Sequence, residues 1–259
     1  MMSTMPGLAL EFPPVSHVTE WPTIFGDGLL AVNKVVLLMW LSILIAFGLF
    51  YVASRQSRLV PTGVQNFAES IVEFVRDGVV LQTMGPEGLS FLPFLVMMFT
   101  FIFLTNIWEI IPVAQMPVNA RIALPAYMGV LVWVLYNFIG IRSQGFFGYF
   151  KSVLFPPGVP KALYLLVTPI EFVSTIVVRP FSLAVRLFAN MLAGHLLLVS
   201  FITITTAVFT LGPSLVIWPV SFGLLVALTG FEVLVSVLQA FIFTILTAVY
   251  IAGAMHPEH

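Results

Sequence analysis

Cysteine is absent from this sequence of 259 residues, and charged residues are scarce. Without cysteine the chain has no disulfide, no thiolate nucleophile and no cysteine-ligated metal site. Lysine and arginine together number 10 and aspartate and glutamate 11, which is 8% of the chain, against ~25% in a typical soluble protein. No basic run is present to hold a phosphate backbone, which excludes nucleic acid as a partner.

Hydrophobic residues, in contrast, make up 60% of the chain, and the mean hydropathy is +1.09. Too little charge remains to cover a surface that faces water, so the composition indicates an integral membrane protein. Residues 1–27 lack the cationic start and the long apolar core of a secretory signal, and they lack the arginines of a transit peptide. We therefore interpret the apolar stretches that follow as mature structure.

A helix of about 20 apolar residues crosses the hydrocarbon layer of a bilayer, which is about 30 Å thick. By this rule the sequence predicts an all-α, polytopic membrane protein with five transmembrane helices, at residues 29–53, 91–111, 122–140, 161–209 and 214–255. The last two would be about 70 Å and 60 Å long if they were helical throughout. That is about twice the hydrocarbon thickness, so we expect both to be tilted and kinked, the fourth at Pro169 and Pro180.

One further segment, between Pro61 and Gln82, has apolar residues at helical spacing. Its apolar side holds Val64, Phe67, Ile71, Phe74, Val75 and Val79, and its polar side holds Gln65, Glu69, Glu73, Arg76 and Asp77. This pattern predicts an amphipathic helix that lies in the membrane interface. We expect the segments 55–63, 112–121 and 144–160 to be polar linkers between the spans.

The basic residues are divided unequally between the two sides of these spans. One side carries Arg55, Arg58, Arg76, Arg142, Lys151 and Lys161, and the other carries Lys34 and Arg121. By the positive-inside rule, the N-terminus lies outside and the C-terminus in the cytoplasm. We therefore expect residues 1–28 to form an extracytoplasmic tail and residues 29–259 to form a single transmembrane domain.

Ionisable side chains inside the predicted spans are the candidate functional residues, because an arginine at a bilayer centre costs about 2.5 to 3.5 kcal/mol on insertion scales. They are Glu109, Glu171, Arg186, His195 and Glu232. Arg186 shares one helix face with Ser182 and Asn190, at a spacing of four residues. A guanidinium keeps its proton in proteins, so this residue can only attract an anion or repel a cation. The alternative is a structural ion pair with Glu171 or Glu232.

His195 and Glu232 differ from Arg186, because both can exchange protons near neutral pH in a suitable environment. In the orientation above, both fall in the outer half of the membrane, as do Asn106 and Glu109. Glu171 falls in the inner half. The sequence thus predicts proton-relay groups on the two sides of a fixed central charge. For each residue alone, a satisfied structural group is the alternative interpretation.

Other kinds of chemistry have no candidate residues. No phosphate-binding glycine loop and no Ser-His-Asp set is recognisable, so we expect no active site for phosphate chemistry in this chain. We expect no metal and no cofactor. Two alternative functions stay open, a non-catalytic scaffold and an ion-coupled secondary transporter. The transporter would usually show paired halves with helices broken at matching positions, and we find no such pairing.

Two segments carry a family resemblance. The segments 182–195, SLAVRLFANMLAGH, and 238–250, LQAFIFTILTAVY, resemble subunit a of the F-type ATP synthase, and the likeness extends through 106–112, NIWEIIP. The resemblance implies a stator subunit with two offset proton half-channels beside a rotating c-ring, which couples proton translocation to ATP synthesis. It also implies the peripheral stalk subunit b and the rest of the synthase as partners. The overall pattern favours a bacterial plasma membrane over a mitochondrial inner membrane.

The resemblance also assigns roles to individual residues. Arg186 matches the essential arginine of the family, and Asn190 and Gln239 match neighbours that face the ring. We expect Ser182, on the same helix face as Arg186, to face the ring as well. His195 and Glu232 match the relay pair of the outer half-channel, exchanged relative to some bacterial members. The spacing from Glu171 to Pro180 is one residue longer than the family pattern for the glutamate of the inner half-channel.

Overall fold

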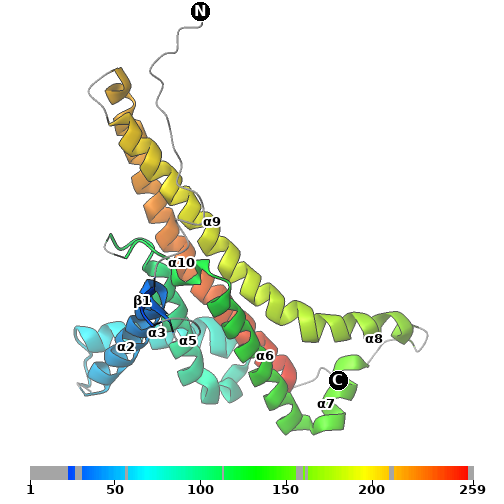
Figure 1. The fold of residues 1–259 in the computed structure, drawn as a ribbon. Coiled ribbons are helices and arrows are strands. Elements are labelled where there is room, and N and C mark those ends of the chain that lie inside the picture. Colours follow the sequence, from blue (N-terminus) through cyan, green and yellow to red (C-terminus); the bar gives the residue numbers. More distant parts are fainter. Residues whose placement is uncertain are drawn as a thin grey trace, which may run out of the picture.

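The computed structural model describes residues 23–26, 31–55, 58–112, 114–155, 160, 163–209 and 213–255. Most of the predicted N-terminal tail, Lys161 and the last four residues lie outside these ranges. Within them, five helices are long and apolar enough to cross a membrane. Figure 1 shows them as one helical bundle, from which a long pair of helices extends at one end.

The five spans confirm the sequence prediction. The first is α2 (Lys34–Arg55), and the second joins a 3₁₀ segment, η3 (Gly85–Phe91), to α5 (Leu92–Ile107). The third is α6 (Ala123–Gln144). The fourth comprises α8 (Tyr164–Val173), the π-helical segment η6 (Ser174–Val178) and α9 (Arg179–Val208), and the fifth is α10 (Trp218–Met255). A short 3₁₀ helix, η7 (Pro213–Val216), precedes the fifth.

Two short strands precede the first span, where the sequence predicted a tail and a helix start at residue 29. β1 (Thr23–Phe25) pairs antiparallel with β2 (Val32–Asn33), so the predicted helix start was wrong by five residues. The helix begins at Lys34 because the side chain of Asn33 caps it. The Oδ1 atom of Asn33 accepts a hydrogen bond from the backbone N–H of Val36 at 3.1 Å.

The predicted linker 144–160 is also partly helical, which corrects that prediction. Helix α7 (Phe146–Leu154) follows α6 after a single residue, Gly145, whose φ of 76° is the left-handed conformation that glycine favours. The carboxyl end of α6 is tied to the end of α10, since the side-chain amide of Gln144 donates to the carbonyl of Ala254 at 2.8 Å. The linker 112–121 contains one 3₁₀ turn, η4 (Val118–Ala120).

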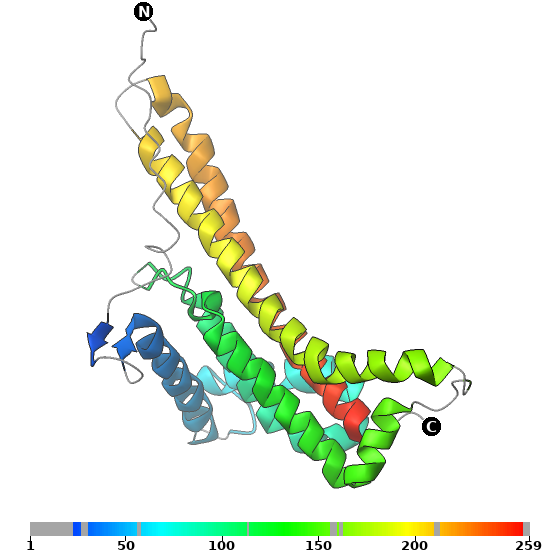
Figure 2. The same cartoon turned by 45° about the vertical axis from the view of Figure 1, so that its right-hand side comes forward.

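Helices α9 and α10 lie side by side as an antiparallel pair (Figures 1 and 2). Helix α5 packs on α10, α6 packs on both α9 and α10, and α2 contacts α5 at the edge of the bundle. The buried core contains aromatic residues such as Tyr136 and Phe243 and many aliphatic ones, among them Leu95, Ile102, Val132, Leu187, Ala240 and Ile251. Helix α10 therefore contacts both α5 and α9.

The fourth span is helical from Tyr164 to Val208 and changes direction between α8 and the upper part of α9 (Figure 2). The π-helical segment η6 lies between Pro169 and Pro180, the two positions at which the sequence predicted kinks. A π-helical turn and a proline both interrupt the regular i→i−4 ladder, and each is a recognised place for a helix to bend.

The predicted amphipathic helix is present as α3 (Val64–Val75), which continues through the π-helical segment η2 (Arg76–Val80) into α4 (Leu81–Thr83). Gln65 was predicted on the polar side, but it is buried. Its side chain is satisfied there by the backbone N–H and carbonyl of Arg58 and by Glu69. On the exposed side, Arg76 donates to Asp77 at 2.8 Å, which holds the pKa of that carboxyl below its usual range.

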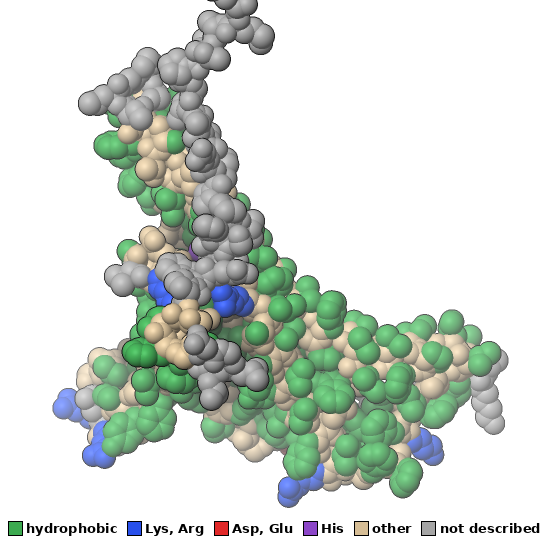
Figure 3. Space-filling model, viewed as in Figure 1, with side chains coloured by type: hydrophobic (Ala, Val, Ile, Leu, Met, Phe, Trp, Pro, Cys, Tyr) green, Lys and Arg blue, Asp and Glu red, His purple; other side chains and the backbone are tan. Residues whose placement is uncertain are grey.

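Figure 3 shows hydrophobic side chains spread over the described face, with the visible Lys and Arg side chains few and confined to its lower margin and its middle. Large apolar residues on several helices turn outward; Phe138 on α6 is 58% exposed and Leu165 on α8 is 89% exposed. Such a surface is unfavourable in water and suits contact with lipid chains. The apolar exterior therefore agrees with a multi-pass membrane protein.

Candidate functional site

Three ionisable side chains from three segments meet inside the bundle. Glu109 lies in the turn after α5, His195 on α9 and Glu232 on α10. All three are buried, with 4%, 5% and 3% of their surfaces exposed. Buried ionisable groups are costly unless they interact, so their common location marks a site.

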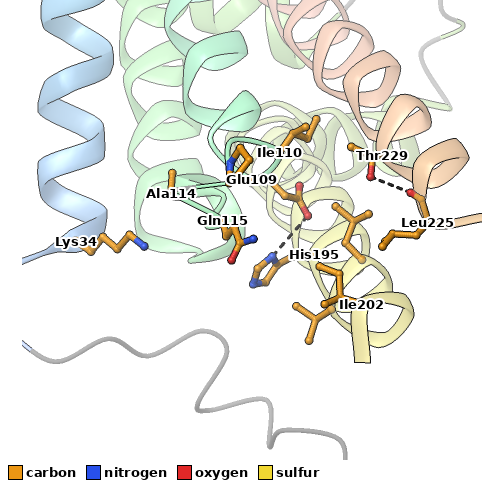
Figure 4. Close-up of a pocket in the computed structure, with 12 residues that line it drawn as sticks. Lys34, Glu109, Ile110, Ala114, Gln115, His195, Ile202, Leu225 and Thr229 are labelled. Carbon is orange, nitrogen blue, oxygen red and sulfur yellow. Dashed lines mark hydrogen bonds and ion pairs between the residues drawn. The ribbon is translucent and has the colours of Figure 1, made fainter. Parts of the chain in front are cut away.

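One of these contacts joins His195 to Glu109. The Nδ1 atom of His195 lies 3.6 Å from Oε1 of Glu109, and Figure 4 shows the two side chains pointing toward one another. This distance is within ion-pair range but beyond a direct N–H···O bond. Neither carboxylate oxygen of Glu109 has a hydrogen-bond partner among the described residues. The pair can therefore exchange a proton through one water molecule or after a small side-chain rotation.

Glu232 reaches the same place because α9 has a glycine beside His195. A Cβ atom at Gly194 would lie 2.5 to 2.7 Å from the carboxylate atoms of Glu232, which shows that this carboxylate rests against the backbone of α9. Gly194 is thus part of the site, although the sequence analysis did not identify it. A lone glycine in an apolar helix is the signal that could have indicated a close approach.

A buried amide network holds the segment that carries Glu109. The side-chain amide of Asn119 donates to Oδ1 of Asn106 at 2.6 Å and to Oγ1 of Thr105 at 2.8 Å. Asn106 was predicted as a relay residue, and it lies one turn before Glu109, wholly buried. Asn119, in the predicted polar linker, was missed because a linker position gives no sign of burial. The network fixes the turn in which Glu109 stands.

A cavity of about 340 Å³ adjoins the pair (Figure 4). It is lined by Glu109 and His195, by Gln115 from the following loop, by Lys34 at the start of α2, by apolar residues of α9, and by Leu225 and Thr229 of α10. The residues of α2 and of the loop place the cavity at the end of the bundle where α2 and α6 begin. Water-sized molecules can therefore come close to the His195–Glu109 pair from that end.

Arg186 stands apart from these acids. It is half-buried on α9, and within the described ranges no carboxylate lies within 4.0 Å of it. The alternative interpretation of Arg186 was an ion pair with Glu171 or Glu232. No such ion pair is present among the described residues. Ser182, one turn earlier, is likewise half-buried, and Asn190, one turn later, is exposed.

The predicted ring-facing residues Asn190 and Gln239 are joined directly. The side-chain amide of Asn190 donates to Oε1 of Gln239 at 2.8 Å, which links α9 to α10 one turn beyond Arg186. Asn190 is exposed, whereas Gln239 is 2% exposed. The hydrogen-bonded pair therefore connects the outer surface of α9 with the interior of the bundle.

Glu171 is not part of this cluster. It lies half-buried on α8, and the π-helical segment and the first half of α9 separate it from His195. Between them, the guanidinium of Arg179 lies 5.4 Å from the ring centroid of Tyr250, a cation–π contact. Among the described residues, no group of three or more His, Cys, Asp or Glu side chains is arranged to hold a metal ion.

The sequence is similar to those of known proteins. Residues 36–252 match the family described as ATP synthase A chain. The chain is 40% identical over 259 residues to ATP synthase subunit a of Frankia alni, across 95% of this chain and 87% of that protein. It is 42% identical over 255 residues to ATP synthase subunit a of Streptomyces lividans, across 96% and 89% of the two chains. The chain therefore belongs to the ATP synthase A chain family.

Proposed function

We propose that this chain is the stator subunit of a bacterial F-type ATP synthase and conducts protons through two offset half-channels beside a rotating c-ring. The observation that carries the proposal is Arg186, a permanent cation on α9 without a carboxylate partner among the described residues. The name ATP synthase subunit a, borne by the relatives, supports the same role. The partners we propose are the c-ring, the peripheral stalk subunit b and the rest of the synthase.

A cation in this position can control the charge of passing carboxylates. A ring carboxylate that faces lipid must be protonated, because an exposed charge there costs several kcal/mol. Opposite Arg186 the ionised form is favoured instead, so the carboxylate releases its proton there. Arg186 also repels a free proton that would otherwise cross directly from one half-channel to the other. Across 100 mV, each proton that completes the route supplies about 2.3 kcal/mol.

The cluster at the cavity forms the outer half-channel in this proposal. Protons move from the cavity to Glu109 and His195, then to Glu232, and reach the ring beside Asn190 and Gln239. Burial of all three ionisable groups supports a route that excludes bulk water while it offers proton carriers. The carriers are close to one another, since Glu232 rests on the residue next to His195.

The inner half-channel lies on the other side of Arg186 in this proposal. Glu171, half-buried on α8, is our candidate for its carboxylate. The end of the bundle that carries Arg55, Arg142 and Lys151 then faces the cytoplasm, with the N-terminus outside, as the positive-inside rule predicts. Phosphate chemistry belongs to other subunits of the complex.

The test of the proposal is an Arg186→Ala variant of the complete synthase in inverted membrane vesicles. We expect ATP-driven proton pumping to be abolished, while passive proton flux through the membrane sector persists or rises. Arg76→Ala is the matched control, since Arg76 is an exposed arginine that pairs with Asp77, and it should leave pumping intact. Coupled pumping at the native rate in Arg186→Ala would contradict the role.

A further inference from the structure

We infer that Ser236 on α10 is the middle ligand of a buried chain of water molecules that carries protons from Glu232 toward the ring, with the side-chain amide of Gln239 donating to the last water of the chain. The inference rests on the proposed function and adds to it a site for water between the outer relay and the ring-facing pair.

The three residues lie on one face of α10. Positions 232, 236 and 239 are separated by four and three residues, the spacing at which side chains align along a helix. All three are buried, with exposed fractions of 3% for Glu232, 0% for Ser236 and 2% for Gln239. They form a polar row inside the bundle that leads from the relay cluster toward the Asn190–Gln239 pair.

Each member of this row has a polar atom that no other described residue satisfies. These atoms are Oε2 of Glu232, Oγ of Ser236 and Nε2 of Gln239. Buried polar atoms are nearly always hydrogen-bonded, and where the protein offers no partner an ordered water molecule commonly does so. Three consecutive unsatisfied groups along one helix face therefore indicate a continuous hydrated path rather than isolated packing defects.

Ser236 lacks the hydrogen bond that most buried hydroxyls of the described bundle make; Thr175 and Thr205 lack it too, but neither lies on α10. In helices, serine and threonine usually donate to the carbonyl one turn earlier. Thr244 and Thr247, on the same helix, do so at 2.7 and 2.8 Å, and Thr100 on α5 does so at 2.8 Å. The hydroxyl of Ser236 makes no such bond. It is therefore available both to donate and to accept, which a proton-carrying hydrogen-bond chain requires of the members between its two ends.

The spacing along the helix suits one water molecule in each gap. At 1.5 Å per residue, Glu232 and Ser236 are about 6 Å apart along the axis, and Ser236 and Gln239 about 4.5 Å. Two hydrogen bonds of about 2.8 Å in series span about 5.6 Å. Without Ser236 the path from Glu232 to Gln239 is about 10.5 Å, too long for a single bridging water. Because Glu232, Ser236 and Gln239 are all buried, we expect only a molecule as small as water to fit between their side chains.

The experiment compares two pairs of proteins. The two members of each pair have side chains of similar shape at position 236, and only one of them carries a hydroxyl group. Native Ser236 is compared with Ser236→Ala, and Ser236→Thr is compared with Ser236→Val, all in the complete synthase. Passive proton flux is measured in vesicles stripped of the catalytic sector and is normalised to the amount of this subunit in the membrane. We expect the hydroxyl-bearing member of each pair to conduct about tenfold faster, as for one hydrogen bond lost from a proton-transfer step.

Thr244→Val is the matched control, because it removes an equally buried hydroxyl that already donates to a carbonyl of its own helix. We expect native flux from it. Equal flux in Ser236→Ala and the native protein would overturn the assignment of Ser236, and so would equal flux in the Thr and Val variants. If Arg186→Ala abolishes coupled pumping while Ser236→Ala conducts normally, only the water site fails. If Arg186→Ala pumps normally, the proposed function itself fails.

Discussion

Substitution of Gly194 by alanine perturbs the relay without removing any of its ionisable groups. The added Cβ atom would lie 2.5 Å from Oε2 of Glu232 and 2.7 Å from its Cδ and Oε1 atoms. Non-bonded heavy atoms are usually about 3.5 Å apart or more, so the carboxylate must move by about 1 Å. Because Glu232 is 3% exposed, its neighbours limit where it can go.

A displacement of this size is large for proton transfer. Misplacement of a reacting group by about 1 Å can lower a rate by about 100-fold. We therefore expect Gly194→Ala to reduce passive proton flux by about 10- to 100-fold, while the subunit is still inserted and assembled. The assay is dye-reported proton flux into vesicles that contain the membrane sector, driven by a potassium diffusion potential.

The control and the rescue follow from the same geometry. Gly230 is a second glycine near Glu232 in sequence, but a Cβ atom there would meet nothing within 4 Å, so Gly230→Ala should conduct normally. Combining Gly194→Ala with Glu232→Asp shortens the acidic side chain by about 1.5 Å and should restore part of the flux. Native flux in the fully assembled Gly194→Ala variant would refute this account of how Glu232 is placed.

Two other predictions concern the relay and the packing of the bundle. His195→Ala and Glu232→Ala should each slow proton flux without preventing assembly, and full flux in both single variants over several pH values would refute the relay. Gly129→Ala would place a Cβ atom 2.7 Å from the backbone carbonyl oxygen of Pro180, where α6 crosses α9. We expect a loss of about 1 to 3 kcal/mol of stability, measured by thermal denaturation of the purified subunit in its complex. Gly48→Ala, with nothing within 4 Å of the added atom, should not be destabilised.

The spans could be predicted from the sequence because the bilayer imposes a minimum length of apolar helix. The same rule gives no information about segments outside the hydrocarbon layer. Helix α7, the pairing of β1 with β2 and the burial of Gln65 on α3 depend on contacts with neighbouring segments, which a periodic pattern along one segment does not encode.

The ionisable site residues could each be recognised in the sequence, because an ionisable group in an apolar helix is conspicuous. The sequence did not show which of these residues contact one another. The contact of Glu109 with His195 joins positions 86 residues apart, and it becomes visible only when the turn after α5 is placed beside α9. Gly194 leaves room for the carboxylate of Glu232, and Asn119 donates a hydrogen bond to Asn106. Neither residue is charged, so the search for ionisable groups in apolar helices did not select them.

The central claim is that the face of α9 bearing Arg186 lies against a rotating ring, and cross-linking tests it most directly. Because the chain has no cysteine, a single cysteine can be placed at exposed Asn190, with exposed Val134 on α6 as the control position. A second cysteine is placed on the ring subunit next to its carboxylate, and a disulfide forms only if the two Cα atoms come within about 7 Å. The account predicts a disulfide between the ring and Asn190→Cys and none with Val134→Cys. Absence of the Asn190→Cys product, or equal products from both positions, would contradict it.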